Sequence, residues 1–166
     1  MRPIEGAAAP PAEPGERVRA IVTQVVRALG LNAAVSVEET TEEIRAVVEG
    51  GDELGVMIGR RGATIDALQH VAGRAVAHGG GERKRVVVDA AGYRERREAI
   101  LRRTADRAAE DALAGRRPVE LEPMTAAERR VVHLYLRERV DIETHSEGDE
   151  PERRLILSPV GAKPVV

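Results

Sequence analysis

The sequence predicts an α+β fold. Amphipathic patterns with helical spacing recur along the chain, and short segments of alternating apolar and polar residues, typical of strands, stand between them. The length of 166 residues allows one medium domain or two small ones. A charged fraction of 33% beside an apolar fraction of 42% is typical of a globular protein.

The first predicted elements are a helix and a hairpin. Apolar residues recur over residues 18–29 at the spacing of one helix face, and Gly30 provides a stop. Residues 33–38 and 43–49 then alternate in polarity around a polar turn at residues 39–42, which predicts two paired strands.

Two helices and a third strand are expected next. Asp52 is expected to cap a short helix that ends at Ile58, and a longer helix is expected from Ala63 until glycines end it at residues 79–81. Residues 85–89 follow as a strand. Because this strand returns after a helical crossover, we expect it to lie parallel to one hairpin strand, through a right-handed connection. A three-stranded sheet backed by three helices is therefore predicted.

The rest of the chain predicts two more helices and three short strands. A long helix is expected after Gly92, with Ile100 among its core residues, and it ends before Pro118. Thr125 and Glu128 form a capping box that opens a second helix, since hydroxyl and carboxylate satisfy backbone amides reciprocally. The expected core stripe of that helix is Val131, Val132, Tyr135 and Leu136. The three strands are expected at residues 119–122, 140–144 and 154–157.

Four residues, Gly59-Arg60-Arg61-Gly62, join two helices and are called the glycine loop below. Each glycine is able to take a positive φ and lacks a Cβ, so the main chain can approach a phosphodiester while both arginines supply charge. The amides that open the following helix add a partial positive charge. Two glycines three apart most often mark an ordinary turn, so the surrounding pattern has to support the phosphate-binding interpretation.

The distribution of charge supports that interpretation. The whole chain carries a net charge of −2, but residues 59–117 contain 14 basic and 8 acidic residues. This net-basic segment begins at the glycine loop, as expected for a surface that binds nucleic acid. For the arginines farthest from the loop, a solvated helix face is the alternative.

Several classes of protein are disfavoured. Cysteine is absent, which excludes disulfides and thiolate metal sites and fits a reducing cytoplasm. No export signal is recognised, and no segment approaches the roughly 20 apolar residues that span a membrane. We therefore expect a cytoplasmic protein without membrane insertion. Residues 1–14 and 160–166 are expected to be disordered tails.

An enzyme is a competing class. The chain has no G-x-x-x-x-G-K-[ST] loop, no G-x-G-x-x-G after a strand and no cysteine nucleophile. His133, His145, Glu147 and Asp149 are conceivable metal ligands, but a solvated turn explains the acidic residues better. We expect no catalysis, no metal and no cofactor.

Two motifs stand in a particular order along the chain. The glycine loop lies where the KH family of type II topology keeps its G-x-x-G loop, and Arg129 and His133 match the signature pair of the R-x-x-x-H domain. In this order the two segments resemble the bacterial Jag family, also called KhpB. The resemblance implies a KH domain over residues 15–91 and an R-x-x-x-H domain over residues 92–159. Further matching text is Gly55-Val56-Met57-Ile58, Tyr93-Arg94-Glu95-Arg96-Arg97, Pro123-Met124-Thr125 and Ser146-Glu147-Gly148.

For the KH segment, the resemblance implies a clamp for about four nucleotides of single-stranded RNA. The glycine loop would hold the backbone, and the bases would lie in an aliphatic groove lined by Ile58, Ile65 and the edge of residues 86–88. The alternative for Ile58 and Ile65 is a place in the core. Because Phe and Trp are absent, stacking worth roughly 1 to 3 kcal/mol per base is mostly missing, so we expect weak, salt-sensitive binding.

Arg129 and His133 are four residues apart and therefore share one helix face, away from the core stripe. We expect them to grip a phosphate jointly. The alternative is a surface arginine beside a histidine that packs locally. Two weak sites on linked modules make a useful binder, because the second contact gains from effective concentration.

The resemblance also implies a biological role. Members of the family are thought to act as RNA chaperones or post-transcriptional regulators that influence cell-envelope (peptidoglycan) growth and cell length, commonly with a small single-KH partner, KhpA. Many members carry an extra N-terminal domain, where this sequence has about 14 residues rich in Pro and Ala. The alternative is a protein-binding adaptor with a degenerate RNA site, motivated by acidic terminal thirds and missing aromatics.

Overall fold

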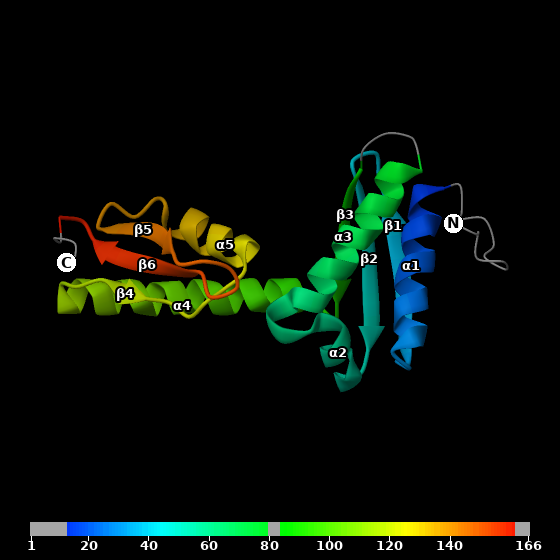
Figure 1. Cartoon of the computed structure of the whole chain (residues 1–166), viewed down its shortest axis with the longest axis horizontal. Helices are drawn as coiled ribbons and strands as arrows, with labels where there is room; N and C mark the ends of the chain where they lie inside the picture. The colour runs from blue at the N-terminus through cyan, green and yellow to red at the C-terminus, as the bar shows by residue number, and fades with distance from the viewer. Residues whose placement is uncertain (1–12, 80–83, 162–166) are drawn as a thin grey trace. The chain divides into compact units, whose positions relative to one another are not determined.

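The chain folds into two compact units, unit 1 (Met1–Tyr93) and unit 2 (Arg94–Val166). A computed structural model describes residues 13–79 and 84–161. The class is α+β, as predicted, with one three-stranded sheet in each unit (Figure 1). No helix within the described ranges is long and apolar enough to cross a membrane. Most of both tails expected at the chain ends lies outside the described residues.

Unit 1 has the predicted order of elements. β1 pairs antiparallel with β2, and β2 pairs parallel with β3, so the strand order is β1-β2-β3 and both the hairpin and the parallel third strand are confirmed. The elements are α1 (Pro14–Ala28), β1 (Ala33–Glu39), β2 (Glu43–Gly50), η1 (Asp52–Leu54), α2 (Gly55–Ile58), η2 (Arg60–Gly62), α3 (Ala63–His78) and β3 (Arg85–Ala90).

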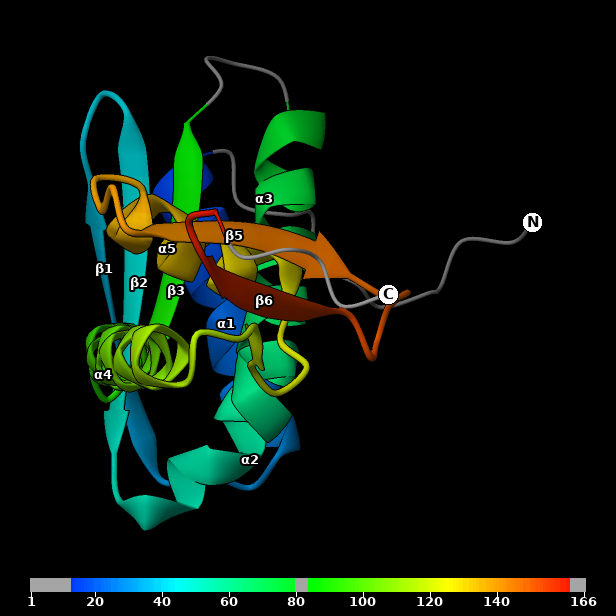
Figure 2. The ribbon, with the colours of Figure 1, turned by 90° about the vertical axis from the view of Figure 1, so that its left-hand side faces the viewer.

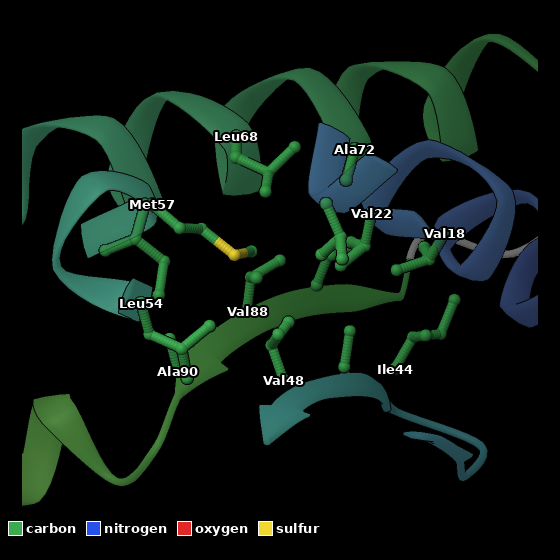
Figure 3. Packing of buried hydrophobic residues seen from close by; sticks show 14 of the residues in the cluster. Val18, Val22, Ile44, Val48, Leu54, Met57, Leu68, Ala72, Val88 and Ala90 are labelled. Carbon is green, nitrogen blue, oxygen red and sulfur yellow. The ribbon is translucent and has the colours of Figure 1, made fainter. Parts of the chain in front are cut away.

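The core of unit 1 lies between the sheet and the helices α1 and α3. The apolar stripe of α1 packs in this core from Val18 to Val26, as its periodicity predicted. Leu29 was expected in the same stripe but is exposed, because the helix ends at Ala28. Burying such side chains stabilises the fold by roughly 1.5 to 3 kcal/mol each. Figure 3 shows the packing of Val18 and Val22 from α1, Leu68 and Ala72 from α3, Ile44 and Val48 from β2, and Val88 from β3.

Two helix ends in unit 1 are satisfied by residues distant in sequence. α1 begins without a side-chain cap of its own, and Oε2 of Glu39 accepts a hydrogen bond from the amide of Gly15 at 2.9 Å. Near the end of α3, Nη1 of the buried Arg17 donates to the carbonyl of Ala75 at 3.2 Å. Both bonds therefore fix helices against other parts of unit 1 as well as satisfying their ends.

The short helical segment before the glycine loop differs from its prediction. Asp52 is the first residue of the 3₁₀ turn η1 rather than its cap, and Gly51 precedes it without a side-chain cap bond. The amide of Leu54 donates to the carbonyl of Gly51 at 3.2 Å, so a backbone bond closes this turn. The expected cap at Asp52 is therefore wrong.

Unit 2 contains a long helix, a short helix and an antiparallel sheet in the order β4-β6-β5. Figure 2 shows β5 and β6 side by side in orange and red. The predicted strand at residues 119–122 is shorter than expected. The elements are α4 (Tyr93–Gly115), which starts at the last residue of unit 1, β4 (Val119–Glu120), α5 (Ala126–Leu136), β5 (Ile142–Glu147) and β6 (Arg154–Pro159).

The core of unit 2 combines small residues of α4 with larger residues of the other elements. The capping box of Thr125 and Glu128 is confirmed, with each side chain accepting from the other residue's amide. Alanines on α4 lack bulk, so this helix packs closely against its neighbours. The buried set includes Ala105, Ala108, Ala109, Ala112, Val132, Leu136, Ile142, Leu155 and Leu157.

Two residues expected in the core of unit 2 are exposed. Ile100 is 44% exposed and Tyr135 is 39% exposed. The Tyr135 hydroxyl donates to Oδ2 of Asp106 at 3.0 Å, and the guanidinium of Arg102 lies 5.3 Å from the centre of the tyrosine ring. Tyr135 thus stands at the border of the buried stripe, where its ring is bound by polar groups of α4.

Candidate nucleic-acid interface

The backbone of the glycine loop turns sharply through left-handed conformations. Gly59 has φ 72° and Gly62 has φ 82°, as the two glycines predicted. Arg61 also has a positive φ of 54°, which the sequence did not predict. A non-glycine residue costs on the order of 1 to 2 kcal/mol in this conformation. The surrounding structure holds Arg61 there, and strained residues of this kind cluster at ligand-binding sites.

Close packing is a second reason for glycine at both positions. A Cβ on Gly59 would overlap the side chain of Thr64. A Cβ on Gly62 would lie 2.9 Å from Cε1 of Tyr93. Any larger residue at either position has to displace its neighbour, in addition to the strain of a positive φ. The side chains of Thr64 and Tyr93 therefore lie close against the two glycines of the loop.

The loop presents positive charge beside the start of a long helix. Arg60 is exposed and Arg61 is half-buried. α3 begins at Ala63, and its N-cap residue Gly62 makes no side-chain cap hydrogen bond. Amides at a helix start, the helix dipole and adjacent arginines suit an anionic oxygen. This geometry is able to bind a phosphate group of a nucleic-acid backbone.

The groove expected beside the loop is less open than predicted. Ile58 is half-buried and packs against the core cluster of unit 1. Ile65 is 0% exposed, so its place in the groove is wrong: it belongs to the buried stripe of α3 and to the core of unit 1. Residues 86–88 of β3 are also buried. The amide of Val88, on the edge strand β3, donates to Oε1 of Gln69 at 3.1 Å. This amide is therefore already hydrogen-bonded within the protein.

Unit 2 contains a shallow pocket beside the first half of α5. His133 lies in it, as does Arg129, so the structure brings the two signature residues together. Nδ1 of the exposed His133 lies 2.6 Å from Oγ1 of Thr144, which fixes the imidazole against β5. The pocket is lined by Ala126, Ala127, Arg129, Arg130, His133, Thr144, His145 and Ser146.

Arg129 contributes differently from the expectation that it grips a phosphate. The residue is 8% exposed, its Nη1 donates to the carbonyl of Met124 at 2.7 Å, and its Nη2 donates to Glu150 at 2.7 Å. These bonds make Arg129 a structural residue of unit 2. Its neighbour Arg130 is exposed at the pocket and was missed. The sequence shows two adjacent arginines, but it does not show which of them forms hydrogen bonds within unit 2.

Ion pairs reduce the positive charge of the net-basic segment. Arg97 contacts Glu128 at 2.7 Å, and Lys84 contacts Glu39 at 2.6 Å. Arg102 pairs with Glu98 one turn earlier on α4. The count over residues 59–117 therefore overstates the charge that is available to a ligand. Arg60 at the loop is exposed, and so are Arg103 and Arg107 on α4.

No cluster of three or more potential metal ligands occurs among residues 13–79 and 84–161. His145 lies 3.8 Å from Glu147 on the same strand, and this pair is exposed. The histidines and acidic residues considered as ligands therefore form no metal site within these ranges.

Comparison with known families identifies both units. The model of the KhpA/KhpB KH domain matches residues 16–89, and the model of the R-x-x-x-H domain matches residues 99–159. Together the two matches span most of the chain in the order that the sequence predicted.

Three curated relatives of this chain share one name, RNA-binding protein KhpB. The Clostridium symbiosum protein is 37% identical over 137 residues, which cover 81% of this chain and 61% of that protein. The Lactiplantibacillus plantarum protein is 38% identical over 104 residues, 63% of this chain and 32% of that protein. The match to the Bacillus subtilis protein is 29% identical and covers 88% of this chain and 71% of the relative. The chain thus spans less than two thirds of the first two relatives. By its two domains and these relatives, the chain belongs to the KhpB (Jag) family.

Proposed function

We propose that this chain binds single-stranded RNA and acts as an RNA chaperone or post-transcriptional regulator. The observation that carries the proposal is the glycine loop, whose three positive φ angles turn the backbone sharply, with two arginines, immediately before the start of α3. Phosphate contacts of this kind supply affinity without reading sequence. The relatives with both domains are named RNA-binding proteins, which supports the same ligand.

The two domains have different parts in this proposal. Residues 15–91 form the KH domain and clamp the RNA backbone, with Ile58 at the border of the base-binding surface. Residues 92–159 form the R-x-x-x-H domain and supply a second, weaker contact through the pocket of His133 and Arg130. Linking the two contacts raises the overall affinity, because the second becomes intramolecular.

The cellular part of the proposal comes from the family resemblance. The protein acts in the cytoplasm, without catalysis, and influences cell-envelope growth and cell length through bound transcripts. A small protein with a single KH domain, similar to KhpA, is the proposed partner.

A titration of RNA affinity tests the proposal. The probe is a fluorescent oligouridylate of about eight nucleotides, longer than the roughly four that a KH loop clamps. The variant R60D/R61D should lose at least about tenfold in affinity, and the dependence of log K on log salt should flatten by about 1.4 if two phosphate contacts are lost. Equal affinity of this variant and the wild type would contradict the proposal.

A matched control is available in the other unit. The variant R116D/R117D changes the net charge by the same amount, and both arginines are exposed. Arg116 has a positive φ of 48°, close to the 54° of Arg61, so each double variant places one aspartate at a positive φ. Loss of binding in R60D/R61D alone assigns the effect to the glycine loop, whereas equal loss in both would indicate non-specific attraction.

The second candidate is a protein-binding adaptor with a degenerate RNA site. It is favoured by the internal pairing of Arg129 and by the ion pairs that neutralise part of the basic segment. Crosslinking in cells separates the two functions. RNA recovered from the wild type and depleted from R60D/R61D supports RNA binding, whereas equal recovery of RNA from both proteins favours the adaptor.

A further inference from the structure

One aromatic ring lies directly at the glycine loop. The whole sequence contains two tyrosines, no phenylalanine and no tryptophan, and Tyr93 is the one that belongs to unit 1. Tyr93 is also the first residue of the family-matching segment Tyr93-Arg94-Glu95-Arg96-Arg97. The proposed RNA clamp assigns no role to this segment, but the position of the ring indicates one for Tyr93.

The ring of Tyr93 covers Gly62. A Cβ added to Gly62 would lie 2.9 Å from Cε1, 3.0 Å from the hydroxyl oxygen and 3.3 Å from Cζ of Tyr93. The hydroxyl end of the ring therefore rests on the main chain of the loop. Tyr93 also packs against the core cluster of unit 1, yet it is only half-buried. Tyr93 therefore contacts both the core and the loop while part of the residue stays exposed to solvent.

We propose that Tyr93 is an RNA-contacting residue of the KH domain. The exposed part of its ring packs against the sugar and base next to the phosphate that the glycine loop holds. This inference rests on the proposed function, because the loop has to bind the phosphate first. The ring reaches Gly62, so a nucleotide seated on the loop lies next to the ring.

The chemistry of the ring fits such a contact. Every base has a π-face, so stacking on an aromatic ring tolerates any sequence. The ring is held by the core on one side and has few internal rotations, so little entropy is lost when a nucleotide binds. The predicted ligand is therefore a pyrimidine or purine nucleotide within a single strand, recognised by its flat base and sugar rather than by its edges.

Tyrosine signals in NMR spectra test the contact directly. The full chain is labelled with ¹³C only in tyrosine rings, which gives two sets of signals, and Y135F assigns the remaining set to Tyr93. Addition of the oligouridylate of about eight nucleotides should shift the Tyr93 ring signals and give nuclear Overhauser effects to ribose or uracil protons. A wild-type protein that binds the probe without such effects would overturn the inference.

Two substitutions separate the ring from the hydroxyl. Y93F keeps the ring and should stay within about twofold of the wild-type affinity. Y93L keeps apolar volume beside the core but removes the aromatic face, and it should weaken binding on the order of tenfold. Equal affinities of Y93L and Y93F for the probe would contradict an aromatic contact. Because the NMR observation uses the wild-type chain, the test does not depend on how well Y93L folds.

The failure of this inference differs from the failure of the proposed function. If R60D/R61D loses the probe while the Tyr93 signals of the wild type stay unchanged on binding, the clamp is correct and the aromatic contact is wrong. A wild-type chain with no affinity for the probe contradicts both. Shifted Tyr93 signals with contacts to RNA protons, together with the loss in Y93L, support the contact.

Discussion

Nη2 of Arg129 lies 2.7 Å from Oε1 of Glu150, and this salt bridge ties α5 to the turn between β5 and β6. Nη1 of the same guanidinium donates to the carbonyl of Met124, which precedes α5. The arginine side chain is 10% exposed, whereas that of Glu150 is 56% exposed. Arg129 therefore joins two segments of unit 2 and has a role in its stability.

The first prediction contrasts Arg129 with its exposed neighbour Arg130. R129A should lower the free energy of unfolding by about 2 to 4 kcal/mol, because it removes hydrogen bonds of a buried charged group. R130A should leave the free energy of unfolding unchanged within about 0.5 kcal/mol and weaken RNA binding. Urea unfolding and the oligouridylate titration measure the two effects. If R129A is as stable as the wild type, Arg129 has no structural role.

The partner of Arg129 illustrates what the sequence could and could not predict. Local patterns predicted α1, the β1–β2 hairpin and the capping box, because periodicity and cap chemistry act within a few residues. Glu150 is 21 residues from Arg129. A contact between residues so far apart depends on how the chain turns back after β5. No local sequence pattern specifies that turn.

The glycine loop likewise combines features that are visible in the sequence with features that depend on the fold. Two glycines predicted positive φ at both ends of the loop, but Arg61 in the left-handed region was not predictable, since most arginines avoid it. The burial of Ile65 was visible in the spacing of Leu68 and Ala72, yet the groove interpretation competed with it. Tyr93 lies 31 positions after Gly62, so its contact with the loop required the fold.

The second prediction concerns the space beside Gly62. G62A should destabilise the protein by about 1 to 3 kcal/mol, because alanine is strained at a φ of 82° and its Cβ meets Tyr93. RNA affinity should fall with it. The control is G55A, at a helical glycine with no atom within 4 Å of an added Cβ, which should be neutral or stabilise by about 0.4 to 1 kcal/mol. Equal unfolding midpoints of the two variants would show that the loop adapts freely.

The third prediction is a pH dependence that originates at Glu39. The hydrogen bond from Lys84 holds the pKa of Glu39 below its usual value, aided by the amide of Gly15 and opposed by partial burial. A carboxyl with a lowered pKa in the folded state stabilises the protein above its unfolded pKa, and this contribution is lost as the pH falls through the folded pKa.

E39Q removes that contribution and is tested by urea unfolding at several pH values. The wild type should be more stable than E39Q at pH 7, and the difference should shrink as the pH falls from about 5 to about 3. The neighbouring E38Q, at an exposed residue, serves as the control for the loss of one negative charge. A difference between wild type and E39Q that stays constant over this range would contradict the assignment.

The last prediction is a coupling between Arg17 of α1 and Gly79 at the end of α3. A Cβ on Gly79 would overlap the guanidinium of Arg17, which donates to the carbonyl of Ala75. Gly79 has φ −76°, so its backbone accepts alanine without strain, and any loss of stability in G79A comes from displacing Arg17.

R17A removes the guanidinium, so G79A should lower the free energy of unfolding less in the R17A protein than in the wild type. A double-mutant cycle from urea unfolding should give a coupling of at least about 0.5 kcal/mol, because the two residues are in contact. Additive effects would indicate that the arginine moves aside without losing its bond to α3.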